Sequence, residues 1–423
     1  MAEKFAIQGR KSLKGEVEIR GAKNAAFPIL TAALLTKEPC VIDNLPLIED
    51  VFQMLKLLEG LGAEISWLGK RKIKIKCSNV NPSKLPVDVV GFFRGSILAL
   101  GPLLAGSNKM KFPSPGGCLI GARPIDAHLD AFSQAGIKVF AKNNFYCFEK
   151  RKQEKKSVEI ILKEFSVTAT ENILLFSASI PRKTIIKIAD QDYQVQELIK
   201  ILKKMGAKVK EAGICAIEIV GTKRLKGFQH TLISDPIETG TFIIIALATK
   251  GKVLIKNAEL SFLTLFLKRL KDFGANFKIL DEHTIKILPS SNLKIDKIQS
   301  LPYPGIHTDL LPELGVLTTQ TKGPTLIHDS LYEGRLKYLE ELNRMGADII
   351  FCDPHRAIVY GQSQLQGIEI PSPDLRAGAS LIIAGLIAKG KTTVNNIYQI
   401  DRGYEKIEER LQRLGANIQR VKT

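Results

Sequence analysis

The sequence lacks a long apolar segment. Its first twenty residues, MAEKFAIQGRKSLKGEVEIR, do not contain the apolar stretch of a secretion signal. The longest apolar runs, such as residues 242–248, are far too short to span a bilayer. Hydrophobic residues make up 45% and charged residues 25%, a balance typical of globular proteins. We therefore expect a cytoplasmic protein with a large core and no membrane insertion.

Cysteine is scarce and scattered. The six cysteines form no C-x-x-C pair, and no histidine lies near them at the spacing of metal ligands. They are Cys40, Cys77, Cys118, Cys147, Cys215 and Cys352. This pattern predicts neither a disulfide framework nor a zinc site, and we expect no bound metal.

Acidic residues are outnumbered. The chain has 61 lysines and arginines against 43 aspartates and glutamates, a formal net charge of +18 that would attract phosphates or nucleic acid. Many lysines alternate with apolar residues, as in residues 70–76 (KRKIKIK), where Ile73 and Ile75 predict the buried face of a strand and the lysines its solvent face. Basic residues are not interleaved with aromatic ones as a stacking surface for single-stranded nucleic acid requires. We expect no nucleic-acid partner.

A chain of 423 residues is too long for one ordinary core, and we expect two domains. The chain repeats a pattern in which an amphipathic helix ends in Gly-Ala or a close variant and an extended segment follows. The repeated glycines are Gly62, Gly136, Gly206, Gly274, Gly346 and Gly415. Their spacing predicts six units of roughly 70 residues, and glycine suits the left-handed conformation that ends a helix.

Each unit is predicted to hold two kinds of helix. The amphipathic helices carry apolar residues at helical spacing, namely Val51, Met54, Leu55 and Leu58 in the first and Tyr404, Ile407, Leu411 and Leu414 in the last. Upstream of each lies a helical stretch of small and apolar residues, for example residues 28–35, 241–248 and 377–388. Helices that are apolar all round are expected to be interior.

A two-stranded signature follows the glycine in residues 216–229 and 357–370, and the same pattern opens the chain in residues 5–19. The sixth unit ends at Thr423 before its closing pair of strands. We therefore expect the N-terminal strands to close it, so that one domain comprises residues 22–234 and the other residues 1–21 and 235–423. The chain would cross between them near residues 20–23 and 234–238, and a cleft between similar domains is a common ligand site.

Three segments concentrate glycine and charge. The first, GAKNAA at residues 21–26, lies at the predicted crossing, where a lysine either faces the cleft or is merely solvated. The second segment is residues 113–132, whose proline and glycine content excludes a regular helix before about Asp126. It is predicted to form a mobile loop that carries Cys118 and Arg123. A thiol near guanidinium groups can act as an acid or a nucleophile, although a lone cysteine can also be structural. His128 is expected to pack against the following helix.

The third set comprises arginines and acids in the C-terminal half, in HTDLLPE (307–313), EGR (333–335), DLRAGAS (374–380) and DRGYEKIEERL (401–411). Planar guanidinium groups suit phosphate and carboxylate, and several of them near helix starts would build an anion site. Surface ion pairs are the alternative, and Arg335 taken alone fits that alternative better.

The sequence resembles the UDP-N-acetylglucosamine 1-carboxyvinyltransferase family over essentially its whole length. The motifs GAKNAA, PGGCLIGARPIDAHL, IETGTF, DLRAGAS and IDRGYEKIEERL occur in the order and spacing of that family. The resemblance implies an α/β fold of two inside-out α/β barrel (β/α prism) domains, each made of three repeats. This fold agrees with the six units counted above.

The resemblance also implies a reaction and its residues. The 3′-hydroxyl of the sugar would add to C2 of phosphoenolpyruvate while C3 gains a proton, and the adduct would then lose phosphate. Cys118 would be the loop acid and would be open to capture by phosphoenolpyruvate or fosfomycin, and Asp309 would be the general base. Lys23, Arg123 and Arg402 would clamp the phosphate and carboxylate.

The remaining implied residues bind substrates. Those at the UDP-sugar would be Asn24, Arg94, Asp126, Ser166, Val167 and Leu331, and those beside the reacting carbons would be Asp374 and Arg376. Pro124, Ile125, Ala127 and Arg335 would also contact substrate. No cofactor is implied, because cationic side chains already serve the anionic donor. The partners are therefore expected to be the two small-molecule substrates, UDP-N-acetylglucosamine and phosphoenolpyruvate.

Three motifs depart from the pattern of the family. Thr168 replaces a glycine in S-V-G-A-T, Pro236 replaces an arginine before I-E-T-G-T, and F-P-T-D becomes Ile306 to Asp309 with Leu311 in place of a later glutamine. His307 beside the expected base either shifts its acidity or points outward, and we expect it to point outward.

Other functions remain to be compared. Enolpyruvyl transfer to shikimate 3-phosphate would predict serine and lysine in place of Lys23 and Asn24 and no loop cysteine. A non-catalytic relative that binds UDP-sugars would not need all the clamp residues. RNA-end processing on a related repeat fold would suit the net charge but lacks a catalytic histidine motif.

Overall fold

The computed structural model describes residues 3–117, 120–121, 124–151 and 156–422. Their contacts divide them into two compact units, which we call the Asp309 unit (residues 3–20, 120–121 and 234–422) and the Lys23 unit (residues 21–117 and 124–233). Backbone hydrogen bonds join the two segments within each unit. Asp235 N–H donates to the carbonyl of Arg20 in the Asp309 unit, and Ala22 N–H donates to the carbonyl of Ile233 in the Lys23 unit, both at 2.8 Å.

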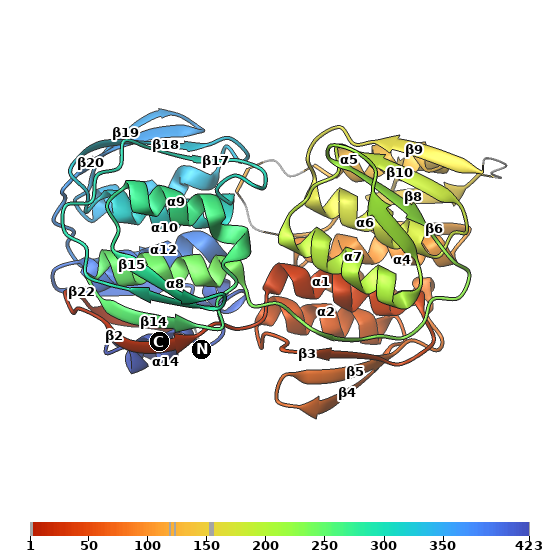
Figure 1. Ribbon diagram of the computed structural model, residues 1–423, viewed down its shortest axis with the longest axis horizontal. Helices are drawn as coiled ribbons and strands as arrows, with labels where there is room; N and C mark the ends of the chain where they lie inside the picture. The colour runs from red at the N-terminus through yellow and green to blue at the C-terminus, as the bar shows by residue number, and fades with distance from the viewer. Residues whose placement is uncertain (1–2, 118–119, 122–123, 152–155, 423) are drawn as a thin grey trace. The chain divides into compact units, whose positions relative to one another are not determined.

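In the Lys23 unit three sheets surround interior helices (Figure 1). Its strands are β3 (Cys40–Asp43), β4 (Glu64–Gly69), β5 (Lys72–Lys76), β6 (Lys109–Pro113), β7 (Ile137–Lys142), β8 (Phe145–Lys150), β9 (Ser157–Ile161), β10 (Lys183–Lys187), β11 (Lys208–Glu211), β12 (Ala216–Val220) and β13 (Gln229–Thr231). Its helices are α1 (Lys23–Ala32), η1 (Ala33–Leu35), α2 (Glu49–Gly60), η2 (Pro82–Lys84), α3 (Val87–Val90), η3 (Arg94–Ala99), α4 (Leu100–Gly106), α5 (Asp126–Gln134), α6 (Val167–Ala178) and α7 (Tyr193–Met205).

The Asp309 unit repeats this arrangement. Its strands are β1 (Glu3–Gln8), β2 (Lys14–Glu18), β14 (Lys252–Lys256), β15 (Phe277–Asp281), β16 (Thr284–Ile287), β17 (Lys297–Ser300), β18 (Gly323–Asp329), β19 (Asp348–Asp353), β20 (Arg356–Gly361), β21 (Glu369–Pro371), β22 (Lys391–Asn395) and β23 (Asn417–Lys422). Its helices are α8 (Pro236–Ala248), η4 (Ser261–Leu263), α9 (Thr264–Asp272), η5 (Thr308–Leu310), α10 (Leu311–Thr318), η6 (Arg335–Lys337), α11 (Tyr338–Arg344), α12 (Leu375–Ile387), α13 (Tyr398–Asp401) and α14 (Ile407–Arg413).

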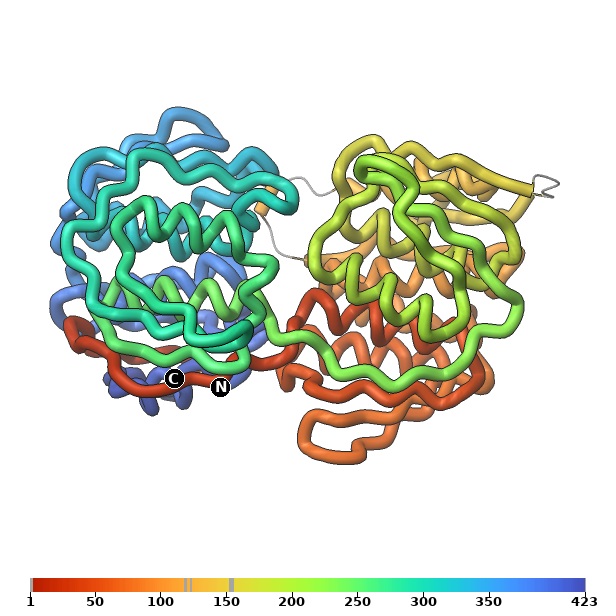
Figure 2. Tube along the Cα trace, in the orientation of Figure 1, coloured from red at the N-terminus to blue at the C-terminus, as the bar shows by residue number. Residues whose placement is uncertain are grey.

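Five of the six sheets share one four-stranded topology, which reflects the sequence repeat, whereas the sheet β6-β8-β7 has three antiparallel strands in the described residues. In the order β9-β10-β12-β11, β9 is parallel to β10, and the other neighbouring pairs are antiparallel. The sheet β21-β22-β1-β23 follows the same rule, with β1 antiparallel to both β22 and β23. Figure 2 shows the N-terminal segment running beside the C-terminal one in the Asp309 unit. The first strand of the chain thus completes the last repeat.

The predictions of the repeat glycines and of the interior helices are confirmed. All six repeat glycines have positive φ, from 90° at Gly274 to 106° at Gly206. The helices predicted to be interior are buried along nearly their whole length, and α8 has every residue buried. In β5 the side chains of Ile73 and Ile75 are inaccessible to solvent, as the alternation with lysine predicts. The fold is the predicted pair of inside-out α/β barrels with three repeats each.

Candidate functional site

Asp309 lies in the short helix η5 at the start of α10. The ring of His307 turns back on this helix, and its Nδ1 accepts a hydrogen bond from the Asp309 N–H at 3.0 Å. The next residue, Thr308, donates its hydroxyl to Oδ2 of the buried Asp329 at 2.6 Å. These two contacts fix the backbone on either side of the Asp309 side chain. The expectation that His307 points outward is wrong, because the ring caps this helix.

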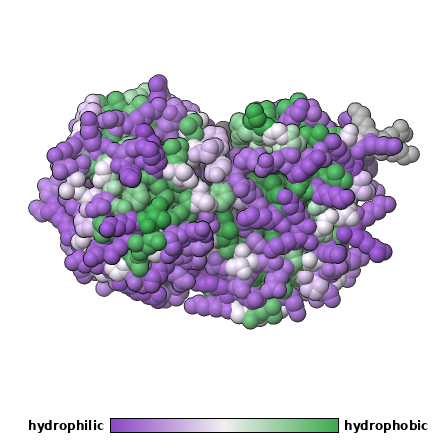
Figure 3. All heavy atoms as spheres, in the orientation of Figure 1, coloured by the Kyte–Doolittle hydropathy of each residue, from purple (hydrophilic) through white to green (hydrophobic). Residues whose placement is uncertain are grey.

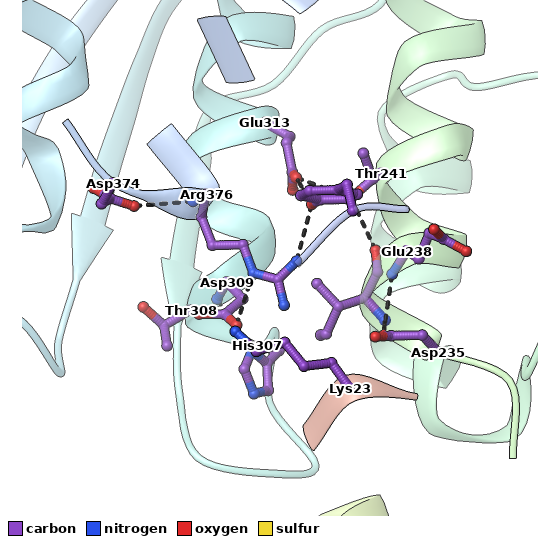
Figure 4. Close-up of polar contacts among 12 residues, drawn as sticks. Lys23, Asp235, Glu238, Thr241, His307, Thr308, Asp309, Glu313, Asp374 and Arg376 are labelled. Atoms are coloured by element: carbon purple, nitrogen blue, oxygen red, sulfur yellow. Dashed lines mark hydrogen bonds and ion pairs between the residues drawn. The ribbon is translucent and has the colours of Figure 1, made fainter. Parts of the chain in front are cut away.

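Two guanidinium groups hold the Asp309 carboxylate (Figure 4). Nη2 of Arg335 lies 3.0 Å from Oδ1, and Nε of Arg376 lies 3.0 Å from Oδ2. Both arginine side chains are almost fully buried, whereas the Asp309 side chain keeps 18% of its exposure. Arg335 is therefore no surface residue, and the surface ion pair that its sequence context favoured is wrong. A partly exposed carboxylate held by two guanidinium groups can accept a proton or a hydrogen bond on its open side.

Arg376 is positioned by the first turn of α12. The carboxylate of Asp374 caps this helix and accepts hydrogen bonds from the N–H groups of Arg376 at 2.9 Å and Ala377 at 3.1 Å. Burial works to lower the pKa of the Arg376 guanidinium, but Tyr404, Asp309 and other acidic neighbours raise it well above its ordinary value. The guanidinium is thus a permanent cation.

On its other side Arg376 reaches a buried polar cluster. Its Nη1 donates to the hydroxyl of Tyr404 at 3.0 Å, and that hydroxyl lies 2.8 Å from Oε1 of Glu313. The hydroxyl of Thr241 lies 2.9 Å from the same Oε1. Burial raises the pKa of the Glu313 carboxyl to about 7, although Arg376 and the hydrogen bonds from Tyr404 and Thr241 lower it.

Sequence reasoning did not identify Glu313, Tyr404 or Thr241 as site residues. Tyr404 was placed on the apolar face of the last helix, but α14 begins only at Ile407, and the Tyr404 hydroxyl enters the polar cluster. Each residue stands inside a motif that was noted. For Thr241 and Glu313 the available signal was a polar group in an otherwise apolar helix.

Two further predicted residues belong to the same unit. Arg402 caps the end of α13, which packs on α12, and its Nη1 donates to Oε1 of Gln399 at 3.0 Å. Its side chain is buried. Leu331 is 39% exposed, and its N–H donates to Oδ1 of Asp329 at 2.8 Å. The strand end at Asp329 therefore supports both the Leu331 turn and the Asp309 helix.

The Lys23 unit holds its own charged group. Lys23 is the first residue of α1, and its Nζ lies 2.8 Å from Oδ2 of Asp50 at the start of α2. The Lys23 side chain is 12% exposed and that of Asp50 is 4% exposed. Asn24 follows it on α1 and is half-buried. The lysine is a held cation rather than a solvated side chain, which excludes the solvated alternative.

The starts of three helices in this unit meet. Nη2 of Arg94, at the start of η3, donates to the carbonyl of Pro124 at 2.7 Å. Pro124 is exposed and is followed by the buried Ile125 and then by α5, which begins at Asp126 as predicted. Ser166 caps the neighbouring α6, where it accepts from the N–H of Ala169. Arg94, Asp126 and Ser166 therefore stand at adjacent helix starts, followed by Ala127 on α5 and Val167 on α6.

His128 packs as predicted and explains one departure of the sequence. Its Nε2 lies 3.0 Å from the hydroxyl of Thr168, and its Nδ1 lies 3.0 Å from the Asn172 side-chain nitrogen. The hydroxyl of Thr168 thus joins α6 to α5. A glycine at this position could not make the contact. Burial, with a smaller effect of Arg94, lowers the pKa of His128 to about 3. Pro236, the second departure, is the first residue of α8, where proline suits a helix.

Cys118 and Arg123 lie outside the described residues. Of the five cysteines within them, Cys352 is exposed, Cys215 is partly exposed and three are buried. Burial raises the pKa of Cys40 to about 11 and that of Cys77 to about 12, so both remain neutral thiols.

Other kinds of site were sought in the described part of the chain. It holds no group of three or more His, Cys, Asp or Glu residues placed to bind a metal ion. None of its helices has both the length and the apolar character needed to cross a membrane. An open hollow of about 610 Å³ lies between α9 and the β15–β16 hairpin, lined by Leu267, Ile279 and His283 among others. Figure 3 shows apolar surface among polar residues on this face of the unit, but none of the described site residues lines the hollow.

Comparison with known proteins places these features in context. A family model described as EPSP synthase (3-phosphoshikimate 1-carboxyvinyltransferase) matches residues 7–411. The chain is 40% identical to the UDP-N-acetylglucosamine 1-carboxyvinyltransferase of Finegoldia magna, with 98% of each chain covered. It is also 40% identical to UDP-N-acetylglucosamine 1-carboxyvinyltransferase 2 of Carboxydothermus hydrogenoformans, with 99% of each covered.

Two solved structures share the fold. The enolpyruvyl transferase NikO from Streptomyces tendae superposes with a TM-score of 0.89 at 23% sequence identity, covering 99% of both chains. EPSP synthase from Acinetobacter baumannii superposes with a TM-score of 0.75 at 19% identity, covering 99% of this chain and 100% of that one. At these identities the likeness concerns the fold alone.

Proposed function

We propose that this chain, which belongs to the UDP-N-acetylglucosamine 1-carboxyvinyltransferase family, transfers the enolpyruvyl group of phosphoenolpyruvate to the 3′-hydroxyl of UDP-N-acetylglucosamine. Phosphate is the second product, and the sugar is thereby committed to peptidoglycan synthesis. The observation that carries this proposal is 40% identity to curated enzymes of that name over 98–99% of the chain. In the Asp309 unit, Arg335 and Arg376 stand within hydrogen-bonding distance of the Asp309 carboxylate, which supports it.

The reaction is an addition followed by an elimination. The sugar hydroxyl oxygen bonds to C2 of phosphoenolpyruvate, its proton passes to a base, and C3 gains a proton to become a methyl group. The tetrahedral adduct then loses a proton from C3 and expels phosphate, which restores the double bond. Each step moves a proton and leaves charge on oxygen, so the site must supply a base, an acid and fixed cations.

Asp309 is proposed as the base. Its carboxylate is held in place by Arg335 and Arg376, yet it retains an exposed side that a hydroxyl could approach. The two guanidinium groups stabilise the ionised form, in which the carboxylate can accept a proton. Asp374 and Arg376 are proposed to lie beside the reacting carbons, because Asp374 fixes the first turn of α12 from which Arg376 projects.

The remaining assignments rest on the family resemblance. Cys118 is proposed as the loop acid, and Lys23, Arg123 and Arg402 as the cations that bind the phosphate and carboxylate of the donor. The adjacent helix starts at Arg94, Asp126 and Ser166 are proposed, with Asn24, Pro124, Ile125, Ala127, Val167, Leu331 and Arg335, to bind the UDP-sugar. Free N–H groups at helix starts favour anionic ligands, which suits a diphosphate. No cofactor is proposed, and we place the enzyme in the cytoplasm, where both substrates would be met.

The proposal is tested by measuring phosphate release from purified, folded protein. Release is expected only when UDP-N-acetylglucosamine and phosphoenolpyruvate are both present, with the enolpyruvyl-sugar formed in equal amount. Omission of either substrate is the control. A folded preparation that releases no phosphate above background with both substrates rules the proposal out.

A second acceptor is considered because the family model that matches residues 7–411 is described by the shikimate reaction. The same assay with shikimate 3-phosphate in place of the UDP-sugar separates the two. Faster release with shikimate 3-phosphate would reverse the assignment. Binding of UDP-N-acetylglucosamine without turnover would instead indicate a non-catalytic UDP-sugar-binding relative.

A further inference from the structure

Glu313 is a fully buried acid that the proposed reaction does not use. It lies on α10, and its Oε1 accepts from the hydroxyls of Tyr404 at 2.8 Å and Thr241 at 2.9 Å. Its other oxygen, Oε2, has no hydrogen-bond partner among the described residues. One oxygen of this carboxyl group is therefore hydrogen-bonded to two hydroxyls, and the other is buried without a hydrogen bond among the described residues.

The Tyr404 hydroxyl connects this acid to the proposed base. It accepts a hydrogen bond from Nη1 of Arg376 at 3.0 Å, while Nε of the same guanidinium donates to Oδ2 of Asp309 at 3.0 Å. Figure 4 shows Arg376 extending from α12 towards Asp309. The guanidinium is thus held at two ends, by Asp309 on one side and by the Tyr404–Glu313 pair on the other.

The hydrogen bonds of Glu313 can be satisfied in its ionised state and in its protonated state. Tyr404 and Thr241 have one hydroxyl hydrogen each, and an ionised Oε1 can accept both. The Tyr404 oxygen is then left to accept from Arg376. A proton on Oε2 would lack an acceptor among the described residues. A proton on Oε1 could be donated to the Thr241 hydroxyl oxygen, because that hydroxyl can itself donate to the carbonyl of Ile237 at 3.0 Å. Tyr404 would then donate to a neutral carboxyl group instead of a carboxylate, which is a weaker hydrogen bond.

The charges around Glu313 are nearly balanced. Burial raises its pKa to about 7 and Asp309 adds to this rise, while Arg376 from α12 and the Tyr404 and Thr241 hydroxyls lower it. Tyr338 from α11 also faces it, and the pKa of Tyr338 is raised by burial and by its acidic neighbours. The two states of Glu313 are therefore close in free energy near neutral pH.

The other acidic groups nearby are already engaged. Asp235 and Glu238 belong to α8, where Asp235 caps the helix and Glu238 binds Arg410. Among the inward-facing described residues of β17, β18 and β20, which also pack on α10, only Asp329 is titratable, and it accepts from Thr308 and from backbone N–H groups. Arg335 is paired with Asp309. Glu313 is thus the acid of this cluster that is poised between two states.

We propose that Glu313 is a positioning residue whose protonation state controls how Arg376 is held against Asp309, with Tyr404 as the link. This inference rests on the proposed function, because Asp309 is the base of that reaction. In the ionised state Tyr404 donates to Glu313 and anchors Arg376. In the protonated state this anchor weakens, and Arg376 can move with respect to the Asp309 carboxylate.

The test is the pH dependence of kcat in wild-type protein and in Glu313→Gln, which keeps the size and one acceptor oxygen. The ratio of the wild-type kcat to the variant kcat cancels ionisations common to both proteins. We expect this ratio to rise by about threefold to tenfold between pH 5.5 and pH 8.5, with a midpoint near 7. The KM values should change less than kcat. A ratio that does not vary with pH would overturn the proposal, even if the variant is slower.

Tyr404→Phe tests the link. It removes the hydroxyl and leaves the acid in place, so the pH-dependent part of the Glu313 effect should disappear. In the double variant, Glu313→Gln should then cause no further pH-dependent loss. Independent, additive losses would mean that Glu313 does not act through Tyr404, which also overturns the proposal.

A third variant and a measurement without turnover complete the test. Thr241→Val removes one of the two donors to Oε1, so the midpoint of the kcat profile should move to higher pH, and an unmoved midpoint contradicts the proposal.

The melting temperature of Glu313→Gln relative to wild type should increase as the pH rises from 5 to 8, because the folded wild type must then ionise a buried acid. This readout needs no activity, so an absent pH trend counts against Glu313 alone, whereas an absence of turnover in wild type counts against the proposed function.

Discussion

Oδ2 of Asp309 lies 3.0 Å from Nε of Arg376, although the two residues are 67 positions apart and lie at the starts of different helices. Asp309 precedes α10 and Arg376 lies in the first turn of α12, and these are the interior helices of two successive repeats. Because the repeats have the same construction, equivalent helix starts point to the same end of the unit. The repeat therefore gathers charged residues that are distant in the sequence.

Replacing the proposed base should abolish most of the activity. Asp309→Asn keeps the shape of the side chain but cannot take up the hydroxyl proton, and we expect kcat to fall by about 10²–10⁴-fold. Phosphate release at saturating substrates measures the effect. Asp353→Asn, which removes a carboxylate from a surface ion pair with Arg356, is the control and should be close to wild type. Retention of more than half of the wild-type rate in Asp309→Asn would exclude Asp309 as the base.

The guanidinium of Arg376 should not be replaceable by an amine. Its Nε and Nη1 donate in two directions at once, to Asp309 and to Tyr404, and a lysine cannot reproduce this fork. We expect Arg376→Lys to lower kcat about 10- to 100-fold, the equivalent of losing one charge-assisted hydrogen bond of about 1.5–3 kcal/mol. Arg356→Lys, at the exposed pair with Asp353, serves as the matched control. Equal rates for the two variants would show that a positive charge is enough at position 376.

Local features of the fold were predictable from the sequence, whereas contacts between repeats were not. The helix-ending glycines, such as Gly206, were predictable because a left-handed residue after an apolar helix leaves a local signature. Asp309 and Arg376 were identified by motif, but their pairing depends on the stacking of repeats. Glu313 was missed because its partners, Thr241 and Tyr404, lie 72 and 91 positions away, and no local pattern encodes such contacts.

Cys118 should be the group that fosfomycin labels. The thiolate opens an epoxide far more readily than a hydroxyl does, so Cys118→Ser should lose covalent labelling as detected by intact-protein mass spectrometry. Cys40 and Cys77 are excluded as alternatives, since burial keeps their thiols protonated. Cys352→Ser removes the exposed cysteine and should label like wild type. Labelling that persists in Cys118→Ser and vanishes in Cys352→Ser would transfer the reactivity to position 352.

Acid should destabilise the Lys23 unit through His128. The folded pKa of this buried imidazole is about 3, below the ordinary 6.5, so its stabilising effect is complete above pH 6.5 and is lost as the pH falls towards 3. At pH 5 the free energy of unfolding should have fallen by about 2 kcal/mol. This pH lies about 1.5 units below 6.5, and each pH unit corresponds to about 1.4 kcal/mol. Urea unfolding of wild type and His128→Gln at pH 7.5 and pH 5 measures it. The variant should lose less stability between the two pH values, and identical losses would contradict the expectation.

The repeat glycines should resist substitution for conformational reasons alone. Gly206 has φ of +106°, and a β-carbon added there would meet no atom within 4 Å, so Gly206→Ala isolates the backbone effect from crowding. We expect it to lower the free energy of unfolding by about 1–2 kcal/mol, the cost of a left-handed alanine.

Gly106 offers the matched control, since a β-carbon there also has open space, but the residue ends α4 without a positive φ. Gly106→Ala should be neutral or stabilising by up to about 1 kcal/mol, as alanine favours a helix. Chemical unfolding of both variants gives the comparison, and an equal effect at the two positions would mean that the left-handed conformation is not what the repeat requires of Gly206.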